Sequence, residues 1–223
     1  MIEVIGMGPA TLSLITKESL EKILDKKKII LRTKIHPTVK EIESLGVEIE
    51  SYDSYYDEAQ NFESLYQKIA SDLIKRGKEE NILYGVPGSP FVAEKTVVLL
   101  REAAKSENIE LKIYPALSFL DLIYKQANID PIEGLAIIDA KDEDKFSAIK
   151  DFSLIITQVY DKKIASDVKL ALMEYLDDEY EIFYAHRLGL SEEKIIAAKL
   201  FELDRIKNFD YLTSLYIKKL KKT

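Results

Sequence analysis

The chain has 223 residues, 47% of them hydrophobic, which is enough apolar content for one large core or two modest ones. It contains no cysteine and only two histidines, which excludes disulfides, thiolate metal sites and a cysteine nucleophile and argues against a zinc enzyme. The net charge of -7 argues against a nucleic-acid partner and the lack of any apolar run near 20 residues argues against a membrane partner, so we expect a cytoplasmic protein.

The first half of the chain alternates short apolar runs with amphipathic segments, the pattern of repeated strand-helix units. The clearest helix is 58–75, where Phe62, Leu65, Ile69 and Leu73 recur at spacings of three and four. Such units favour a parallel sheet with helices on its faces. We expect strands at 2–5, 28–32, 81–86 and 109–114, and helices at 14–25, 58–75 and 91–105.

The second half resumes the alternation, so it is also expected to be α/β. The expected boundary lies near Pro115 and divides the chain into domains at 1–114 and 115–223, although no Ser/Gly-rich linker marks it. We expect helices at 118–125 and 163–175, and strands at 135–139, 154–157 and 181–184.

Two loops rich in glycine and proline follow expected strands, at 6–10 (Gly-Met-Gly-Pro-Ala) and 84–90 (Tyr-Gly-Val-Pro-Gly-Ser-Pro). Glycine lets backbone approach a ligand closely, and open α/β sheets bind ligands beyond the carboxyl ends of their strands. The first loop lacks the third glycine of a dinucleotide fingerprint, so a structural turn and a ligand loop are equally supported by spacing. The rigidity of the second loop favours binding.

Few side chains show the pattern of a catalytic group. His36, just before Pro37, is either a general base or a hydrogen-bonding prop, and a lone histidine in a turn is more often a prop. Asp204-Arg205 is either a local ion pair or a ligand contact. The helices carry no carboxylate cluster for Mg²⁺, which argues against a pyrophosphohydrolase, and we expect no metal.

Taken together, these segments resemble the tetrapyrrole methylase family, the class III S-adenosylmethionine-dependent methyltransferases, nearly end to end. The chain is most similar to the branch usually fused to a MazG-type nucleotide pyrophosphohydrolase. The segment 84–94 is the most specific match, because it is similar to the central loop of that branch. The other ordered matches are 6–9, Arg32-Thr33 with His36-Pro37, 115–121, 130–135, 158–160, 165–170, 202–205 and 212–216.

The resemblance implies two α/β domains with S-adenosylmethionine in a cleft between them, usually in a homodimer. It also places a strand at 192–203, and we expect that strand although these residues are strong helix formers. By carry-over, Gly8 and Pro9 shape the cleft floor, Pro87, Gly88, Ser89 and Pro90 present backbone groups to the methionine moiety, and Ser118 and Phe119 contact it. Gln158, Val159, Tyr184 and Ala185 line the adenine and ribose side, and Leu203 and Asp204 close it.

The chain departs from the family pattern at three points. Ala10-Thr11 replaces the usual glycine-aspartate, Ser89 stands where many members carry aspartate, and Ala116 replaces a common glycine. The two aspartate differences weaken the inference of ordinary porphyrinoid methylation, and a tetrapyrrole-like or otherwise planar acceptor stays open. No pyrophosphohydrolase half follows residue 217, so we expect a stand-alone relative or a separated domain.

The first hypothesis is therefore an S-adenosylmethionine-dependent methyltransferase acting on a small-molecule acceptor. Methyl transfer needs the acceptor held roughly 3 to 3.5 Å from the methyl carbon in a site that excludes water, and few side chains are essential. If the acceptor must lose a proton, the candidate bases are His36, Asp121 and Asp204. The alternative is a non-catalytic module that binds S-adenosylmethionine or a nucleotide and partners a MazG-type pyrophosphohydrolase.

Overall fold

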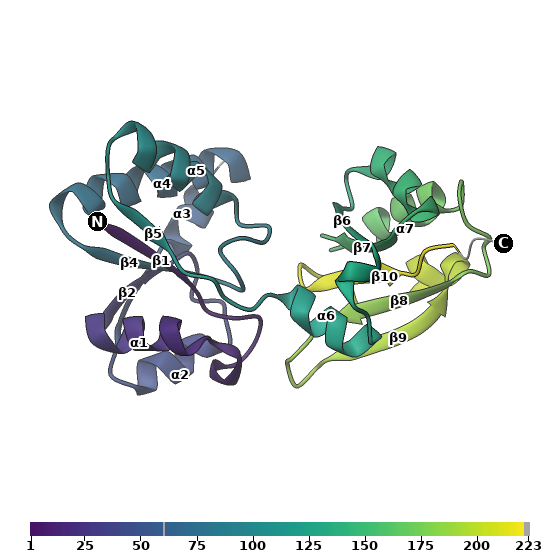
Figure 1. The fold of residues 1–223 in the computed structure, drawn as a ribbon, viewed down its shortest axis with the longest axis horizontal. Helices are drawn as coiled ribbons and strands as arrows, with labels where there is room; N and C mark the ends of the chain where they lie inside the picture. Colours follow the sequence, from purple (N-terminus) through teal and green to yellow (C-terminus); the bar gives the residue numbers. More distant parts are fainter. Residues whose placement is uncertain (60, 221–223) are drawn as a thin grey trace. The chain divides into compact units, whose positions relative to one another are not determined.

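The computed structural model describes residues 1–59 and 61–220 and divides the chain into two compact units, Met1–Phe119 and Leu120–Thr223. Each unit contains one five-stranded sheet flanked by helices (Figure 1), which confirms the predicted α/β class. The sequence placed the end of the first domain at residue 114, and the structural division falls after Phe119.

The sheet of the first unit is parallel throughout, as predicted, and its strand order is β3-β2-β4-β1-β5. Every residue of β1 and β4 is buried, because helices cover both faces of the sheet. Parallel neighbours end at the same edge, so the loops after β1 and β4 emerge side by side, with Gly6 paired to Val86. The strands are β1 (Ile2–Gly6), β2 (Lys28–Leu31), β3 (Glu48–Ser51), β4 (Ile82–Val86) and β5 (Leu111–Ile113).

Helices pack on the two faces of this sheet around separate apolar clusters (Figure 1). One face is covered by α1 (Lys17–Lys26) and α2 (Thr38–Ser44), which bury residues such as Ile23 and Ile42. The other face is covered by α3 (Asp53–Glu58), α4 (Phe62–Glu79) and α5 (Lys95–Ser106), with Leu73 and Leu100 in its core.

The second unit has a mixed sheet of order β6-β7-β10-β8-β9, in which β6 and β7 are parallel and the remaining pairs are antiparallel. Helix α7 (Lys162–Leu172) and the 3-10 segments η3 (Glu143–Lys150) and η4 (Leu200–Arg205) contribute to the core on one face. Helix α6 (Phe119–Ala127) and η2 (Pro131–Glu133) precede the sheet. The strands are β6 (Leu135–Asp139), β7 (Ser153–Thr157), β8 (Glu181–His186), β9 (Lys194–Lys199) and β10 (Thr213–Ile217).

Three expected helices begin later than predicted because local capping fixes their first residues. The segment 14–25 opens with the 3-10 turn η1 (Leu12–Leu14), and α1 begins only after Thr16, whose side chain accepts the Ser19 N–H. Asn61 caps α4 in the same way, and residue 60 of the expected helix 58–75 lies outside the described residues. Glu94 caps α5, so residues 91–94 are loop. The expected helix 163–175 ends at Leu172.

The expected strand at 192–203 is confirmed at β9, because antiparallel pairing with β8 outweighs the helix propensity of these residues. Its last part is the 3-10 segment η4. The sequence analysis missed α2, α3, β3 and β10. Among the described residues, the longest helices lack the apolar length that a bilayer-spanning helix needs.

Candidate cofactor site

The two glycine loops meet at the edge of the first sheet. Gly8 N–H donates to Gly88 O at 3.2 Å, and Gly88 N–H donates to Gly8 O at 2.9 Å. Met7 N–H also donates to Val86 O at 2.9 Å. The structure therefore brings together the predicted residues Gly8, Pro9, Pro87, Gly88, Ser89 and Pro90.

Glycine is required in this pair of loops for two different reasons. At Gly6, an added Cβ would lie 2.2 Å from Gly88 O and 2.5 Å from the Ala116 Cβ, so the loops can approach only without a side chain there. Gly8 and Gly88 have φ of +73° and +63°, the left-handed region that favours glycine. An added Cβ at Gly88 would meet no atom within 4 Å, so Gly88 borders open space.

The His36 ring supports the first loop through hydrogen bonds to the backbone. Its Nδ1 accepts the Thr38 N–H at 3.3 Å, so the proton of the neutral ring belongs on Nε2, which faces Gly8 O at 3.1 Å. Burial lowers the pKa of His36 to about 4, and the ring is neutral at pH 7. Thr38 adds a hydrogen bond from Oγ1 to Ala10 O at 2.7 Å. Both ring nitrogens of His36 are thus engaged by backbone groups.

The second loop is fixed at its far end by a buried ion pair that the sequence analysis did not assign to the site. Glu94 is 5% exposed, and its Oε2 lies 3.2 Å from Arg32 Nη1. Its Oε1 accepts the Thr96 hydroxyl and N–H, at 2.5 and 3.3 Å. Ser89, also buried, accepts the Phe91 N–H on Oγ at 3.3 Å. In the sequence, Arg32 and Glu94 stand out only as members of segments that resemble the family, Arg32-Thr33 and 84–94.

The segment 114–118, between β5 and α6, reaches the same loops, because a Cβ added at Gly6 would lie 2.5 Å from the Ala116 Cβ. Ser118 is buried, and Phe119 is half-buried at the start of α6. The candidate base Asp121 lies in the first turn of that helix.

In the second unit, most predicted contact residues belong to the core. Val159, Tyr184 and Leu203 are fully buried in its main apolar cluster, and the Tyr184 hydroxyl donates to Asn208 O. Gln158 follows β7 with φ of +63°, a backbone conformation unusual for a residue other than glycine. Strand pairing places Gln158 and Ala185 at the same end of the sheet.

Asp204 forms an ion pair within the second unit. Its Oδ2 lies 2.6 Å from Lys169 Nζ on α7, and this hydrogen bond lowers the pKa of the Asp204 carboxyl. The Asp204 carboxylate is therefore already engaged by Lys169.

The other histidine, His186, is buried and lies at the end of β8, and the sequence analysis passed over it. His186 Nε2 and Arg187 Nε lie 3.1 and 2.9 Å from Asp210 Oδ2. Burial alone would raise the pKa of Asp210, but hydrogen bonds from Leu212 N–H, Arg187 and His186 lower it. Across the described part of the chain, no group of three or more histidines and carboxylates has the geometry to hold a metal ion.

Comparison with known sequences gives a family and one relative. The family model described as Tetrapyrrole (Corrin/Porphyrin) Methylases matches residues 1–204. The Uncharacterized protein YabN of Bacillus subtilis (strain 168) is 40% identical over 221 residues. This match covers 99% of the chain and 45% of YabN, so the chain spans less than half of the relative's length.

Several solved structures share the fold at low sequence identity. Diphthine synthase has a TM-score of 0.76 at 14% identity, covering 98% of this chain and 89% of that one. The methyltransferase CobJ has a TM-score of 0.73 at 17% identity, covering 100% and 96%. The cobalamin biosynthetic enzyme CbiF, a cobalt precorrin-4 methyltransferase, has a TM-score of 0.72 at 14% identity, covering 97% and 94%.

Proposed function

Because the chain belongs to the tetrapyrrole methylase family, we propose that it binds S-adenosylmethionine and transfers its methyl group to a small-molecule acceptor. Two of the structurally similar proteins, CobJ and CbiF, are named as methyltransferases. The proposal includes the implied cleft between the two units, a homodimer and a cytoplasmic location. The acceptor is left at the level of a small molecule.

The observation that carries the proposal is the open space beside Gly88. Its backbone is fixed by two hydrogen bonds to Gly8, yet, apart from its two chain neighbours, no residue has an atom within 4 Å of the position that a Cβ would take. A ligand can thus lie directly against the backbone of Gly88, where the family resemblance places the cofactor's methionine moiety. Residues 87–90 fit the cofactor because a rigid backbone can contact a flexible ligand without the help of side chains.

When bound, S-adenosylmethionine supplies an electrophilic methyl group on a sulfonium centre. The residues of this chain have the tasks of orienting the cofactor and acceptor and excluding water. His36 and Glu94 serve these tasks indirectly, because they hold the two loops in register. We propose His36 as a positioning residue in place of a base, since both of its ring nitrogens are already hydrogen-bonded.

A second candidate function is a binding module without turnover that works beside a MazG-type pyrophosphohydrolase. Two of the three candidate bases favour it, because His36 is held by Gly8 and Thr38 and Asp204 is held by Lys169. The greater length of YabN also leaves room for a further domain in that relative.

Two measurements on the purified chain test these proposals. Isothermal titration with S-adenosylmethionine and with its demethylated product tests binding, and we expect saturable binding of both. Incubation with radiolabelled cofactor and a panel of small acceptors then tests transfer. Label transfer to an acceptor supports the methyltransferase, binding with no transfer across the panel supports the module, and no binding of either ligand contradicts both.

A further inference from the structure

The second unit contains a cavity at the end of its sheet opposite to Gln158. The cavity has a volume of about 400 Å³, within the range of small-molecule sites. It is lined by Leu135 and Ser153, the first residues of the parallel strands β6 and β7, whereas Gln158 follows the last residue of β7. The cavity is therefore separate from the predicted cofactor residues of its own unit.

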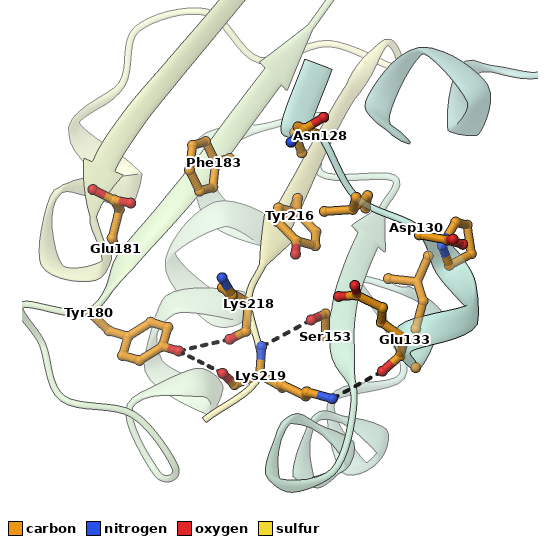
Figure 2. Close-up of a pocket in the computed structure, with 15 residues that line it drawn as sticks. Asn128, Asp130, Glu133, Ser153, Tyr180, Glu181, Phe183, Tyr216, Lys218 and Lys219 are labelled. Carbon is orange, nitrogen blue, oxygen red and sulfur yellow. Dashed lines mark hydrogen bonds between the residues drawn. The ribbon is translucent and has the colours of Figure 1, made fainter. Parts of the chain in front are cut away.

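The walls of this cavity are held by hydrogen bonds among the residues that line it (Figure 2). Lys219 N–H donates to Ser153 Oγ at 3.1 Å, and Lys219 Nζ donates to Glu133 O at 3.0 Å. The Tyr180 hydroxyl donates to Lys218 O at 2.8 Å. Asp130 caps η2 through a 3.0 Å hydrogen bond from Ile132 N–H. The cavity is thus pre-formed, which reduces the ordering that a ligand would have to impose.

Two aromatic rings form the apolar part of the cavity. Phe183 and Tyr216 are paired across β8 and β10, and their ring centroids lie 5.9 Å apart at an angle of 38°. Side chains alternate along a strand, so these rings lie on the face opposite to the core residues Ile182, Tyr184 and Leu215. Figure 2 shows both rings between Glu181 and Glu133.

The charges around the rings select the sign of the ligand. Among the described residues, no hydrogen bond or ion pair engages the carboxylates of Glu133 and Glu181 or the ammonium of Lys218. The Asp130 carboxylate accepts a hydrogen bond from a backbone N–H, and the Lys219 ammonium donates one to a backbone carbonyl. Within the described part of the chain, two carboxylates and one ammonium at the cavity are thus left for a ligand, and aromatic faces attract cations as well.

We propose that this cavity binds a small organic cation, a primary amine with an apolar or aromatic body. The body lies on Phe183 and Tyr216, and the ammonium lies by one of the two carboxylates on either side of these rings, Glu133 or Glu181. Removing either the positive charge of the ligand or the two carboxylates should then abolish most of the affinity. The proposal is independent of methyl transfer, since none of these residues belongs to the glycine loops.

Two probes of similar size and opposite charge, 2-phenylethylammonium and 3-phenylpropanoate, test the proposal by calorimetric titration of the whole chain. We expect the amine to bind with a dissociation constant below about 1 mM and the acid to bind at least tenfold more weakly. The double variant Glu133→Gln/Glu181→Gln should lose at least tenfold in amine affinity. Glu174→Gln removes an exposed carboxylate outside the cavity and should leave the affinity unchanged.

Several results would overturn the proposal. These are the absence of amine binding, equal or tighter binding of the acid, and an unchanged affinity in the double variant. Phe183→Ala gives an independent check, because loss of a ring should weaken the amine by several-fold without changing any charge. The amine should also bind Gly88→Val as it binds the wild type, which separates this site from the glycine loops.

Discussion

The two units present their expected cofactor residues in different ways. In the first unit, Gly8 and Gly88 meet through their backbones at the open edge of a parallel sheet, and both have positive φ. In the second unit, Tyr184 and Leu203 are fully buried side chains of the core. The contrast teaches that changes in the glycine loops should act mainly on ligand binding, whereas changes at the second set should act mainly on folding.

The largest expected effect is a loss of folding stability in the second unit. Tyr184→Ala removes a buried ring that packs against His186 and Phe209, and we expect the free energy of unfolding to fall by about 3 to 5 kcal/mol. Tyr184→Phe loses only the hydrogen bond to Asn208 O and should cost about 1 kcal/mol. Urea unfolding measures both. An alanine variant as stable as the wild type that no longer binds cofactor would instead place Tyr184 in the site.

The next effect concerns the anchor of the second loop. Glu94→Gln keeps an acceptor for Thr96 but leaves the Arg32 guanidinium without its partner, so we expect a loss of about 1 to 3 kcal/mol in urea unfolding. Glu107→Gln is the matched control, because it breaks the solvent-exposed pair with Lys78 at 2.8 Å and should cost at most about 1 kcal/mol. Equal losses in the two variants would show that burial of the Arg32 pair has no special weight.

A third effect, of similar size, depends on pH through His36. The unfolded ring takes up a proton near pH 6.5, whereas the folded ring does so only near its pKa of about 4. Its contribution to stability is thus complete above pH 6.5 and decreases as the pH falls toward 4, by about 1 to 3 kcal/mol.

The matched variant for this prediction is His36→Gln, which keeps a donor for Gly8 O but cannot titrate. Thermal unfolding followed from pH 7 to pH 4 should show a steeper loss of stability for the wild type than for the variant. Parallel curves would mean that the folded and unfolded rings titrate alike.

The sequence predicted the parts of the fold that depend on local pattern. The apolar runs of β1, β2 and β4 and the stripe of α4 are visible without any neighbours. Strand β3, with the sequence Glu-Ile-Glu-Ser, is a short edge strand with one apolar residue, and only its pairing with β2 makes it a strand. The same holds for β9, where β8 imposes a strand on helix formers.

The candidate site also has one part that the local sequence reveals and one part that it does not. Glycine and proline after a strand reveal the loops locally, since glycine permits positive φ and both residues favour tight turns. The contacts that hold these loops join distant positions, His36 with Gly8 and Arg32 with Glu94, so spacing alone could not reveal them. The cavity of the second unit likewise joins distant positions, because strand pairing places Tyr216 beside Phe183 and the segment that carries Glu133 lines the same cavity.

The most direct test of the account compares two glycines that share a conformation. Gly88 and Gly46 have φ of +63° and +76°, and an added Cβ meets no atom within 4 Å at either position. Gly46 lies exposed between α2 and β3, away from the loops. Valine at either position imposes a similar backbone strain of roughly 1 to 2 kcal/mol.

Calorimetric titration of both variants with S-adenosylmethionine is therefore the decisive measurement. The account predicts that Gly88→Val weakens binding at least tenfold, because its side chain fills the space assigned to the cofactor, and that Gly46→Val binds like the wild type. Equal affinities of Gly88→Val and the wild type would contradict the placement of the cofactor against this loop.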